Sequence, residues 1–442
     1  MANEVIIVGG GLSGISSAVW AIEKGLRPTI FERSSQLGGR VASLYAKDSN
    51  NKIDIGQHVL STNYKETKNL LAKIGSVDKV DFRKRLKLKF KLNSNSEIKF
   101  NSWFLPAPLH FFLPLILNSL IPWDERKLML KWIFSFNKLT PDKLKKLTAK
   151  EWLRELGDSP FFDKLIWEPL TIATLNTPFS KASAYSLYQV LTKAFFKSSF
   201  SSGLGFPMDY LDEIFGNPAN KYIKSKGGSI CLRSEVKKLI PTGDKIQAIQ
   251  TNQDQIIETP YLILATSPNE LLRLTSGLPE PYNKPFSNLD KFEYSPIITI
   301  NLWFKSQIEV DTPIAFVDSP IQWMFTFPNN QTKFFGYTVV ISAAFYQIEY
   351  DRQQLIKLVE KEFERFFNKN IHSDFGFINY KIVKEKRATI LQTPQVTELK
   401  PSSITEYKNL VLAGDWIDPD LPATIESAVI SGKQAIQNLI EN

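Results

Sequence analysis

The sequence predicts an α/β fold in which a sheet of parallel strands is interrupted by a second, α+β region. A short apolar run at Glu4–Val8 leads directly into a glycine-rich turn and a helix-like segment, as a buried parallel strand does. Similar apolar runs recur far along the chain, at 260–265 and 410–413. A chain of 442 residues is also too long for one compact core, so the segments between these runs are expected to form a second domain.

The composition excludes two kinds of site. The single cysteine, Cys231, rules out an internal disulfide framework and fits a reducing cytoplasm. Three scattered histidines are too few for a metal site, so no metal is expected. The net charge of +9 suits either nucleic acid or an anionic membrane surface as a partner. The residues after Met1 lack the basic start of a signal peptide, which again favours a cytoplasmic location.

The first turn carries a dinucleotide-binding fingerprint, G-x-G-x-x-G, formed by Gly9, Gly11 and Gly14. Gly9 makes the turn, Gly11 lets the backbone approach a pyrophosphate, and Gly14 lets the helix pack close to the sheet. The helix N-terminus, with Ser13 in its first turn, presents N–H groups to phosphates. Glu32, at the end of the next strand, can accept hydrogen bonds from ribose hydroxyls. The pattern predicts a Rossmann-type dinucleotide-binding domain.

A second loop indicates which dinucleotide is bound. Glu32 is followed by Gly38, Gly39 and Arg40, and this acid-x5-G-G-R element resembles the signature of the FAD-binding amine oxidase and carotenoid desaturase superfamily. The resemblance implies a glutathione-reductase-like FAD-binding domain with FAD as its cofactor. The paired glycines would bring the loop onto the pyrophosphate, and Arg40 would add positive charge there.

The far end of the chain completes the cofactor site by the same resemblance. The last apolar strand runs into Gly414 and Asp415, and the superfamily places this aspartate on the ribityl chain. The final helix follows, and its N-terminus at Thr424 and Ile425 would face the flavin pyrimidine ring, where it stabilises negative charge. Glu426 is expected to make structural hydrogen bonds and not to act as a catalyst.

The domain organisation follows from these pieces. Residues 227–236 resemble the superfamily strand that lays its backbone against adenine, at Val236. An FAD-binding domain is therefore expected from three segments, and an α+β substrate-binding domain from two inserts. The FAD-binding segments are 1–82, 220–292 and 400–442, and the inserts are 83–219 and 293–399.

The most apolar region, 103–123, is about the length of a membrane span. Its four prolines, together with His110 and Asn118, argue against a continuous spanning helix. Tryptophans at both ends suit an element at a membrane interface, and a buried helix that roofs an apolar tunnel is the alternative. We therefore expect an anionic membrane surface, and not nucleic acid, as the partner, with peripheral attachment to the inner face of the cell membrane.

Nearly the whole chain, in order, resembles the squalene-associated FAD-dependent desaturases, now understood as hydroxysqualene dehydroxylases. Several matching strings fall in the inserts, where substrate is chosen. The resemblance implies reductive removal of the hydroxyl of hydroxysqualene to give squalene, in routes to hopanoids or related triterpenes, so a long-chain isoprenoid is the expected ligand. The loop Ile417–Asp420 departs from the family, which often has a threonine there. The strings are Asp54–Leu60, Leu105–His110, Trp167–Leu170, Leu175–Pro178, Gln322–Trp323, Ile341–Ala344, Glu385–Thr389, Gly414–Trp416 and Leu421–Glu426.

The implied chemistry needs an acid for the departing hydroxyl, aromatic faces for an allylic cation, and exclusion of water. Gly56, Gln57 and His58 lie in a loop that the superfamily places beside the flavin ring. His58 is the candidate acid, and its alternative role is to hold that loop. Three tryptophans are candidate walls of the substrate site, with plain core packing as the alternative: Trp167, Trp323 and Trp416.

Three other functions suit the same cofactor fold. A carotenoid-type desaturase would share the apolar substrate. An amine oxidase usually carries a lysine near the flavin, at a position where this chain has Thr299. A non-catalytic isoprenoid-binding protein would not need Glu32, Arg40 and Asp415 intact, as they are here. The pattern predicts no particular oligomeric state.

Overall fold

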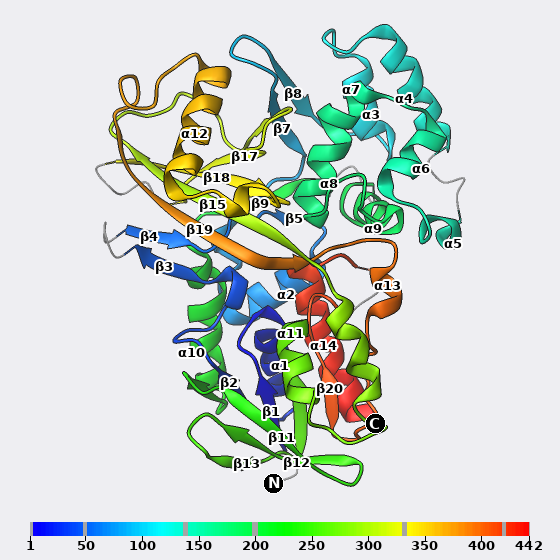
Figure 1. Ribbon diagram of the computed structural model, residues 1–442, viewed down its shortest axis with the longest axis vertical. Coiled ribbons are helices and arrows are strands. Elements are labelled where there is room, and N and C mark those ends of the chain that lie inside the picture. The colour runs from blue at the N-terminus through cyan, green and yellow to red at the C-terminus, as the bar shows by residue number, and fades with distance from the viewer. Residues whose placement is uncertain are drawn as a thin grey trace.

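The structure is a computed structural model that describes residues 3–46, 51–135, 140–196, 202–328, 334–417 and 421–441. A parallel sheet with its helices forms one end of the molecule, and a larger sheet beside a group of helices forms the other end (Figure 1). The predicted α/β class is confirmed.

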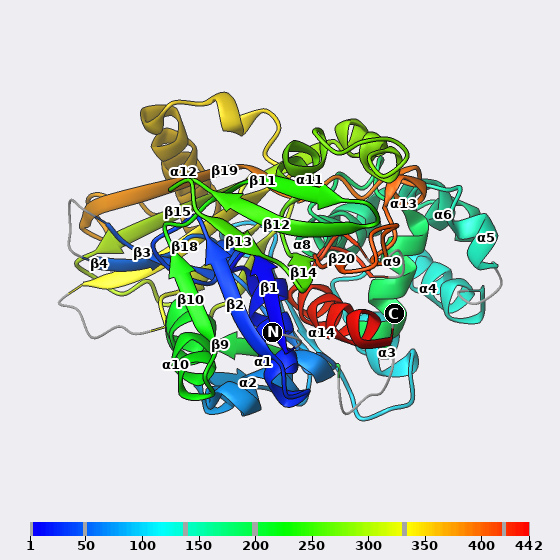
Figure 2. The same ribbon diagram turned by 90° about the horizontal axis from the view of Figure 1, so that it is seen from below.

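The parallel sheet has five strands in the order β10-β2-β1-β14-β20. Its strands are β1 Glu4–Val8, β2 Arg27–Glu32, β10 Ser229–Leu232, β14 Tyr261–Leu264 and β20 Leu410–Leu412. Alternate residues of β1 enter different cores: Val5 and Ile7 pack with helices on one face of the sheet, whereas Ile6 and Val8 pack with strands and a helix on the other face (Figure 2). Both faces of the sheet are covered, which is why β1 is apolar from Val5 to Val8.

The helices and strands of these two covering layers come from all parts of the chain. The helices are α1 Leu12–Glu23, α2 Lys65–Ile74, α10 Asn217–Ser225, α11 Pro268–Thr275, α13 Val396–Leu399 and α14 Ile425–Glu441. A three-stranded antiparallel sheet is formed by β11 Val236–Thr242, β12 Lys245–Thr251 and β13 Ile256–Glu258.

The prediction of one strand over residues 227–236 is wrong. The chain leaves the parallel sheet after Leu232 and turns at Arg233, whose φ is 55°. Backbone hydrogen bonds from Arg233 to Ser34 and from Ser234 to Glu32 direct it away. Val236 then begins β11 in the antiparallel sheet.

The larger sheet has seven strands in the order β19-β15-β18-β17-β16-β7-β8. They are β7 Lys87–Lys91, β8 Glu97–Asn101, β15 Tyr294–Phe304, β16 Ile314–Phe316, β17 Trp323–Thr326, β18 Phe335–Ser342 and β19 Phe377–Ile390. The helix α12, Arg352–Phe367, packs its apolar side on this sheet. All seven strands come from the predicted inserts, and all five parallel strands from the predicted FAD-binding segments; the domain boundaries themselves stay a prediction.

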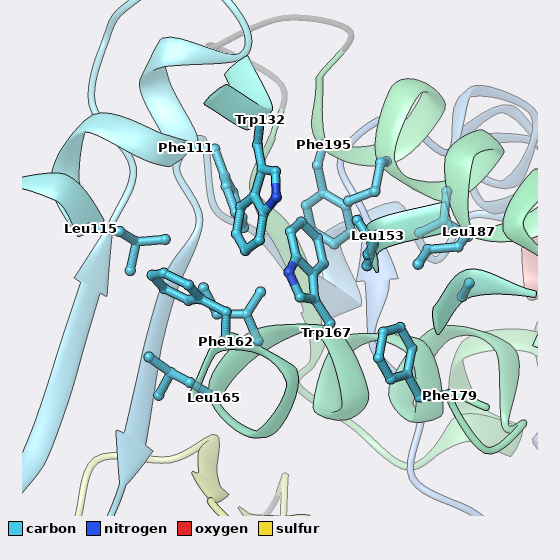
Figure 3. Packing of buried hydrophobic residues seen from close by; sticks show 14 of the residues in the cluster. Phe111, Leu115, Trp132, Leu153, Phe162, Leu165, Trp167, Phe179, Leu187 and Phe195 are labelled. Carbon is cyan, nitrogen blue, oxygen red and sulfur yellow. The ribbon is translucent and has the colours of Figure 1, made fainter. Parts of the chain in front are cut away.

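Helices from the first insert surround an aromatic core beside the larger sheet (Figures 1 and 3). They are α3 Leu109–Ile116, α4 Trp123–Ser135, α5 Pro141–Leu144, α6 Ala149–Leu156, α7 Pro160–Phe162, α8 Glu168–Leu175 and α9 Ala184–Val190. Residues 103–123 therefore do not form one helix: α3 is short, contains Pro114 and stops seven residues before α4. Within the described part of the chain, no helix is long and apolar enough to cross a membrane.

Short strands join the two ends of the molecule. The hairpin of β3 Ser43–Ala46 and β4 Asn51–Asp54 lies between the two large sheets (Figure 1). A small antiparallel sheet has the order β5-β9-β6. Its strands are β5 Leu60–Ser61, β6 Val80–Phe82 and β9 Leu204–Pro207.

Candidate functional site

The glycine-rich turn after β1 packs too tightly for side chains at two positions. A Cβ atom on Gly9, whose φ is 108°, would lie 2.4 Å from the carbonyl oxygen of Ala265. A Cβ atom on Gly14 would lie 1.9 Å from the carbonyl oxygen of Gly9. These contacts bring the start of α1, including Ser13, close against the carboxyl ends of β1 and β14. The two glycines therefore have the packing roles that the fingerprint predicts.

Gly11 differs, because a Cβ atom there would meet no protein atom within 4 Å. The loop containing Gly38 and Gly39 approaches the same place: the Gly38 N–H donates to Gly10 at 2.8 Å. A Cβ on Gly39 would lie 3.2 Å from the Cα of Gly11. No side chain among the described residues caps the amino end of α1. Open space, exposed backbone and uncapped N–H groups together fit a pyrophosphate.

Glu32 lies at the end of β2, as the fingerprint requires. One carboxylate oxygen accepts from the Gly10 N–H at 2.6 Å and the other from the Ser34 N–H at 2.7 Å. Each oxygen keeps a further lone pair for a ribose hydroxyl. The ribose role of Glu32 stays a prediction, and the structure adds that this carboxylate also holds the glycine turn.

Arg40 lies against the other end of the chain. Its guanidinium donates to Asp415 at 2.7 Å and to the Ala388 carbonyl at 2.8 Å. The charge of Asp415 raises the pKa of Arg40. The positive charge of Arg40 therefore lies beside Asp415, the residue predicted to bind the ribityl chain. The N–H of the neighbouring Gly414 donates to the Ser431 hydroxyl at 2.9 Å.

The last helix begins at Ile425, just beyond a cap formed by Thr424. The Thr424 hydroxyl accepts from the Ser427 N–H at 3.2 Å. Glu426 is buried and accepts from the N–H groups of Glu66 and Thr67 at 3.0 and 2.8 Å. Glu426 therefore caps α2, as its expected structural role requires. The loop Ile417–Asp420 lies at 418–420 outside the described residues.

His58 follows Gly56 and Gln57 in the loop after β4. Its Nδ1 lies 2.9 Å from the Gly56 carbonyl oxygen, so Nδ1 carries the proton and donates it. Burial, together with the nearby charge of Arg40, lowers the pKa of His58. A neutral ring with its proton on Nδ1 has none to give from Nε2. This geometry favours the loop-holding role over the proposed acid role.

Val236, the expected adenine contact, is buried at the start of β11. Its carbonyl accepts from the Arg273 guanidinium at 2.6 Å. Cys231 is half-buried on β10, and burial raises the pKa of its thiol.

The three candidate tryptophans do not meet in one place. Trp167 is fully buried in the aromatic core, with its ring 5.2 Å from that of Trp132 (Figure 3). Trp323, on β17, packs against the same core. Trp416 packs in the core below the parallel sheet, and its indole N–H donates to the Thr266 carbonyl at 3.1 Å. Trp167 and Trp323 thus stay candidates for one apolar wall, and Trp416 is part of a different core.

Asn176 was not predicted as a functional residue, although it joins several elements of the structure. Asn176 ends α8, and its side-chain NH₂ donates to the Ser295 carbonyl and the Thr389 hydroxyl, both at 3.1 Å. Its side-chain oxygen accepts from the Ala343 N–H at 2.7 Å. Asn176 therefore ties the helices to β15, β18 and β19. A signal was present, because three of the matching strings contain Asn176, Ala343 and Thr389.

The fold and this cradle define an FAD-dependent oxidoreductase. The sequence pattern of the family described as flavin containing amine oxidoreductase matches residues 12–440, and the chain belongs to this family. No group of three or more His, Cys, Asp or Glu side chains in the described segments could hold a metal ion.

Named relatives agree with the class. The chain is 25% identical to a hydroxysqualene dehydroxylase of Rhodopseudomonas palustris, over 98% of both chains, and 26% identical to one of Zymomonas mobilis, over 97% of both. It is 24% identical to a 15-cis-phytoene desaturase of an Oncidium hybrid, over 99% of this chain and 78% of the relative. The solved cyclohexylamine oxidase of Brevibacterium oxydans superposes with a TM-score of 0.70 at 14% identity, covering 99% and 98% of the two chains, and so shares the fold. The predicted resemblance to the hydroxysqualene dehydroxylases is confirmed.

Proposed function

We propose that this protein reductively removes the hydroxyl group of hydroxysqualene to give squalene, with FAD as its cofactor. The observation that carries the proposal is the similarity to hydroxysqualene dehydroxylases over 97–98% of the chain, which includes both inserts.

Different residues would hold different parts of FAD. The backbone at the glycine turn and the N-terminus of α1 would hold the pyrophosphate. Glu32 would hold the ribose, and Asp415, oriented by Arg40, would hold the ribityl chain. The start of α14 at Thr424 and Ile425 supports the flavin ring. When bound and reduced, FAD would supply a hydride to the allylic carbon.

The proposal predicts that anaerobically reduced protein is reoxidised by hydroxysqualene and forms one squalene per flavin. The flavin bands report the oxidation, and mass spectrometry of the extracted lipid reports the product. Squalene is the matched control, because it has the same chain without the hydroxyl and should leave the flavin reduced. Reduced protein that stays reduced with hydroxysqualene contradicts the proposal.

A carotenoid-type desaturase is the second candidate, and the match to the phytoene desaturase over 99% of the chain favours it. This function runs in the opposite redox direction. Phytoene would bleach the oxidised flavin under anaerobic conditions, whereas the proposed dehydroxylation needs the flavin reduced at the start.

We also propose that α3 and α4 dock on an anionic bilayer, from which the substrate would enter. Trp123, Lys127, Leu130 and Phe134 follow one face of α4 at helical spacing, and all four are exposed, Phe134 by 77%. The opposite face, with Met129 and Trp132, lies in the aromatic core. Figure 1 shows both helices at the end of the molecule away from the parallel sheet.

Further exposed apolar side chains extend this face, and basic ones lie among them. The apolar ones are Trp103, Phe104, Leu109, Leu117 and Leu120. Arg85 lies over the ring of Phe104 and Arg126 over that of Trp123, at 4.8 and 5.8 Å. Apolar side chains with interleaved cations suit anionic lipid.

The docking proposal predicts that the protein sediments with anionic liposomes at low salt and is partly released by salt. The double variant Trp123→Asp, Phe134→Asp should lose most of this binding, since it places two negative charges on the face. Ile256→Asp is the matched control, because Ile256 is 66% exposed on β13, outside this face. Equal sedimentation of the two variants would contradict the docking face.

A further inference from the structure

A small cavity lies where the β4 hairpin meets the seven-stranded sheet. Its accessible volume is about 10 Å³, room for about one water molecule or one hydroxyl group, and one side is open to solvent. Its lining has six polar residues, Asp54, Gln57, Tyr210, Thr299, Asn301 and Thr338, and three apolar ones, Ile53, Phe327 and Pro328. The polar side chains suit a single water molecule or hydroxyl group, which needs polar partners inside a protein.

The cavity adjoins the cofactor cradle. Asp54 and Gln57 lie within four residues of His58, whose pKa is lowered by burial and, to a smaller extent, by the nearby charge of Arg40. Arg40 in turn binds Asp415. The cavity therefore lies between the cradle and the sheet of the inserts, where a reacting carbon would be placed.

Asp54 is held in this cavity by one of its two oxygens. Its Oδ1 accepts from the Ser43 hydroxyl at 2.6 Å and from the Leu211 N–H at 2.9 Å. The Ser43 oxygen accepts in turn from the Asp212 N–H at 3.1 Å. Among the described residues, Oδ2 has no hydrogen-bond partner. One oxygen is fixed and the other is free to carry a proton into the cavity.

The surroundings of Asp54 favour its protonated form. Burial, with a contribution from the charge of Asp212, raises its pKa to about 6, against the hydrogen bonds from Ser43 and Leu211. Lys52 lowers the pKa of Asp54 only slightly, because its ammonium group is paired with two other carboxylates, Asp212 at 2.8 Å and Glu213 at 3.0 Å.

The other elements around the cavity bring no charge. The residues from β15 and β18, namely Thr299, Asn301 and Thr338, are uncharged, and burial raises the pKa of the Tyr210 phenol. Near neutral pH, a useful fraction of Asp54 therefore carries a proton.

We propose that this cavity binds the hydroxyl group of the substrate and that Asp54 protonates it as the carbon–oxygen bond breaks. This inference rests on the proposed function. The oxygen leaves with the Asp54 proton as water, and the carbon gains the hydride, with its two electrons, that reduced FAD supplies. Asp54 is left as a carboxylate and takes its next proton from solvent through the open side of the cavity. His58 is not the donor, because its proton is held by the Gly56 carbonyl.

The test uses Asp54→Asn, since the amide oxygen can still accept from Ser43 and Leu211 but the side chain has no acidic proton. The first measurement is binding to the oxidised, non-reacting holoenzyme by quenching of tryptophan fluorescence. Wild-type protein should bind hydroxysqualene at least tenfold more tightly than squalene. Asp54→Asn should keep most of this preference, because its amide NH₂ can still donate to the alcohol oxygen, and should bind squalene as wild type does. No preference in the wild type overturns the inference.

The second measurement is flavin reoxidation by hydroxysqualene in stopped flow. Asp54→Asn should slow it by about 10²–10⁴-fold, as expected for a lost general acid. The wild-type rate should be highest at low pH and fall as pH rises through about 6, because the protonated carboxyl is the active form. Asp212→Asn should move this fall to lower pH with the same maximal rate, since it removes a charge that raises the Asp54 pKa.

The outcomes separate the two proposals. Near wild-type reoxidation in Asp54→Asn, or a wild-type rate that does not change through about pH 6, overturns the role of Asp54. The second criterion needs no variant and holds even where Asp54→Asn fails to fold. A wild-type protein that prefers the alcohol but is never reoxidised by it contradicts the dehydroxylation and supports the cavity as a hydroxyl site.

Discussion

Gly11→Ala and Gly14→Ala are expected to fail in opposite ways, although they lie three residues apart in one turn. The methyl group at Gly11 meets no protein atom within 4 Å, and the backbone there has φ −72° and ψ −177°, which alanine adopts freely. The Gly11→Ala chain should therefore fold as wild type does. The methyl would fill the space assigned to the pyrophosphate, so FAD affinity should fall at least tenfold, or by about 1.4 kcal/mol.

Gly14→Ala should lose the fold itself. Its methyl would lie 1.9 Å from the backbone oxygen of Gly9, which cannot move without separating α1 from β1. Overpacking typically costs about 1–3 kcal/mol, and a backbone clash belongs at or above the upper end. Thermal unfolding of the apo proteins and flavin absorbance of the purified proteins measure the two effects. A Gly11→Ala protein that is as yellow as wild type would show that the pyrophosphate lies elsewhere.

Asn176→Ala is expected to destabilise the junction between the helical insert and the larger sheet. The variant leaves the buried Ser295 carbonyl and the partly buried Thr389 hydroxyl without their donor, and the partly buried Ala343 N–H without its acceptor. A buried group left unsatisfied costs about 1–3 kcal/mol and a partly buried one less, so the loss is a sizeable part of a typical stability of about 5–15 kcal/mol. Denaturant unfolding should show this loss.

Asn368→Ala is the matched control for Asn176→Ala. Both asparagines end a helix in the left-handed conformation, with φ 52° at Asn368 and 45° at Asn176. Asn368 is exposed at the end of α12, so its replacement should cost only the left-handed strain, about 1 kcal/mol. Equal losses in the two variants would mean that the hydrogen bonds of Asn176 contribute nothing measurable.

Local sequence patterns were sufficient to predict a feature wherever the residues that determine it are consecutive. The strand Glu4–Val8 was predicted with its observed bounds, because apolar run, glycine turn and helix are consecutive. The approach of Gly38 to the first turn followed from a recognised motif. The residues 103–123 were ambiguous for a physical reason. The segment around α3 buries Phe111 and Phe112 and leaves Leu109 and Leu117 exposed. The prediction of an interfacial element and the prediction of a buried helix each describe only one of these two sides.

By itself, the sequence determined the cofactor, the fold class and the resemblance to isoprenoid enzymes, because glycine spacing and strand periodicity are properties of neighbouring residues. Only the tertiary structure decided how the chemistry is distributed. Asp54, Tyr210 and Thr299 come from β4, the segment before α10, and β15, and no local pattern places them around one cavity. The same holds for the burial that raises the pKa of Asp54. Desolvation and hydrogen bonding depend on what the fold packs against a side chain, and that is decided by segments more than a hundred residues away.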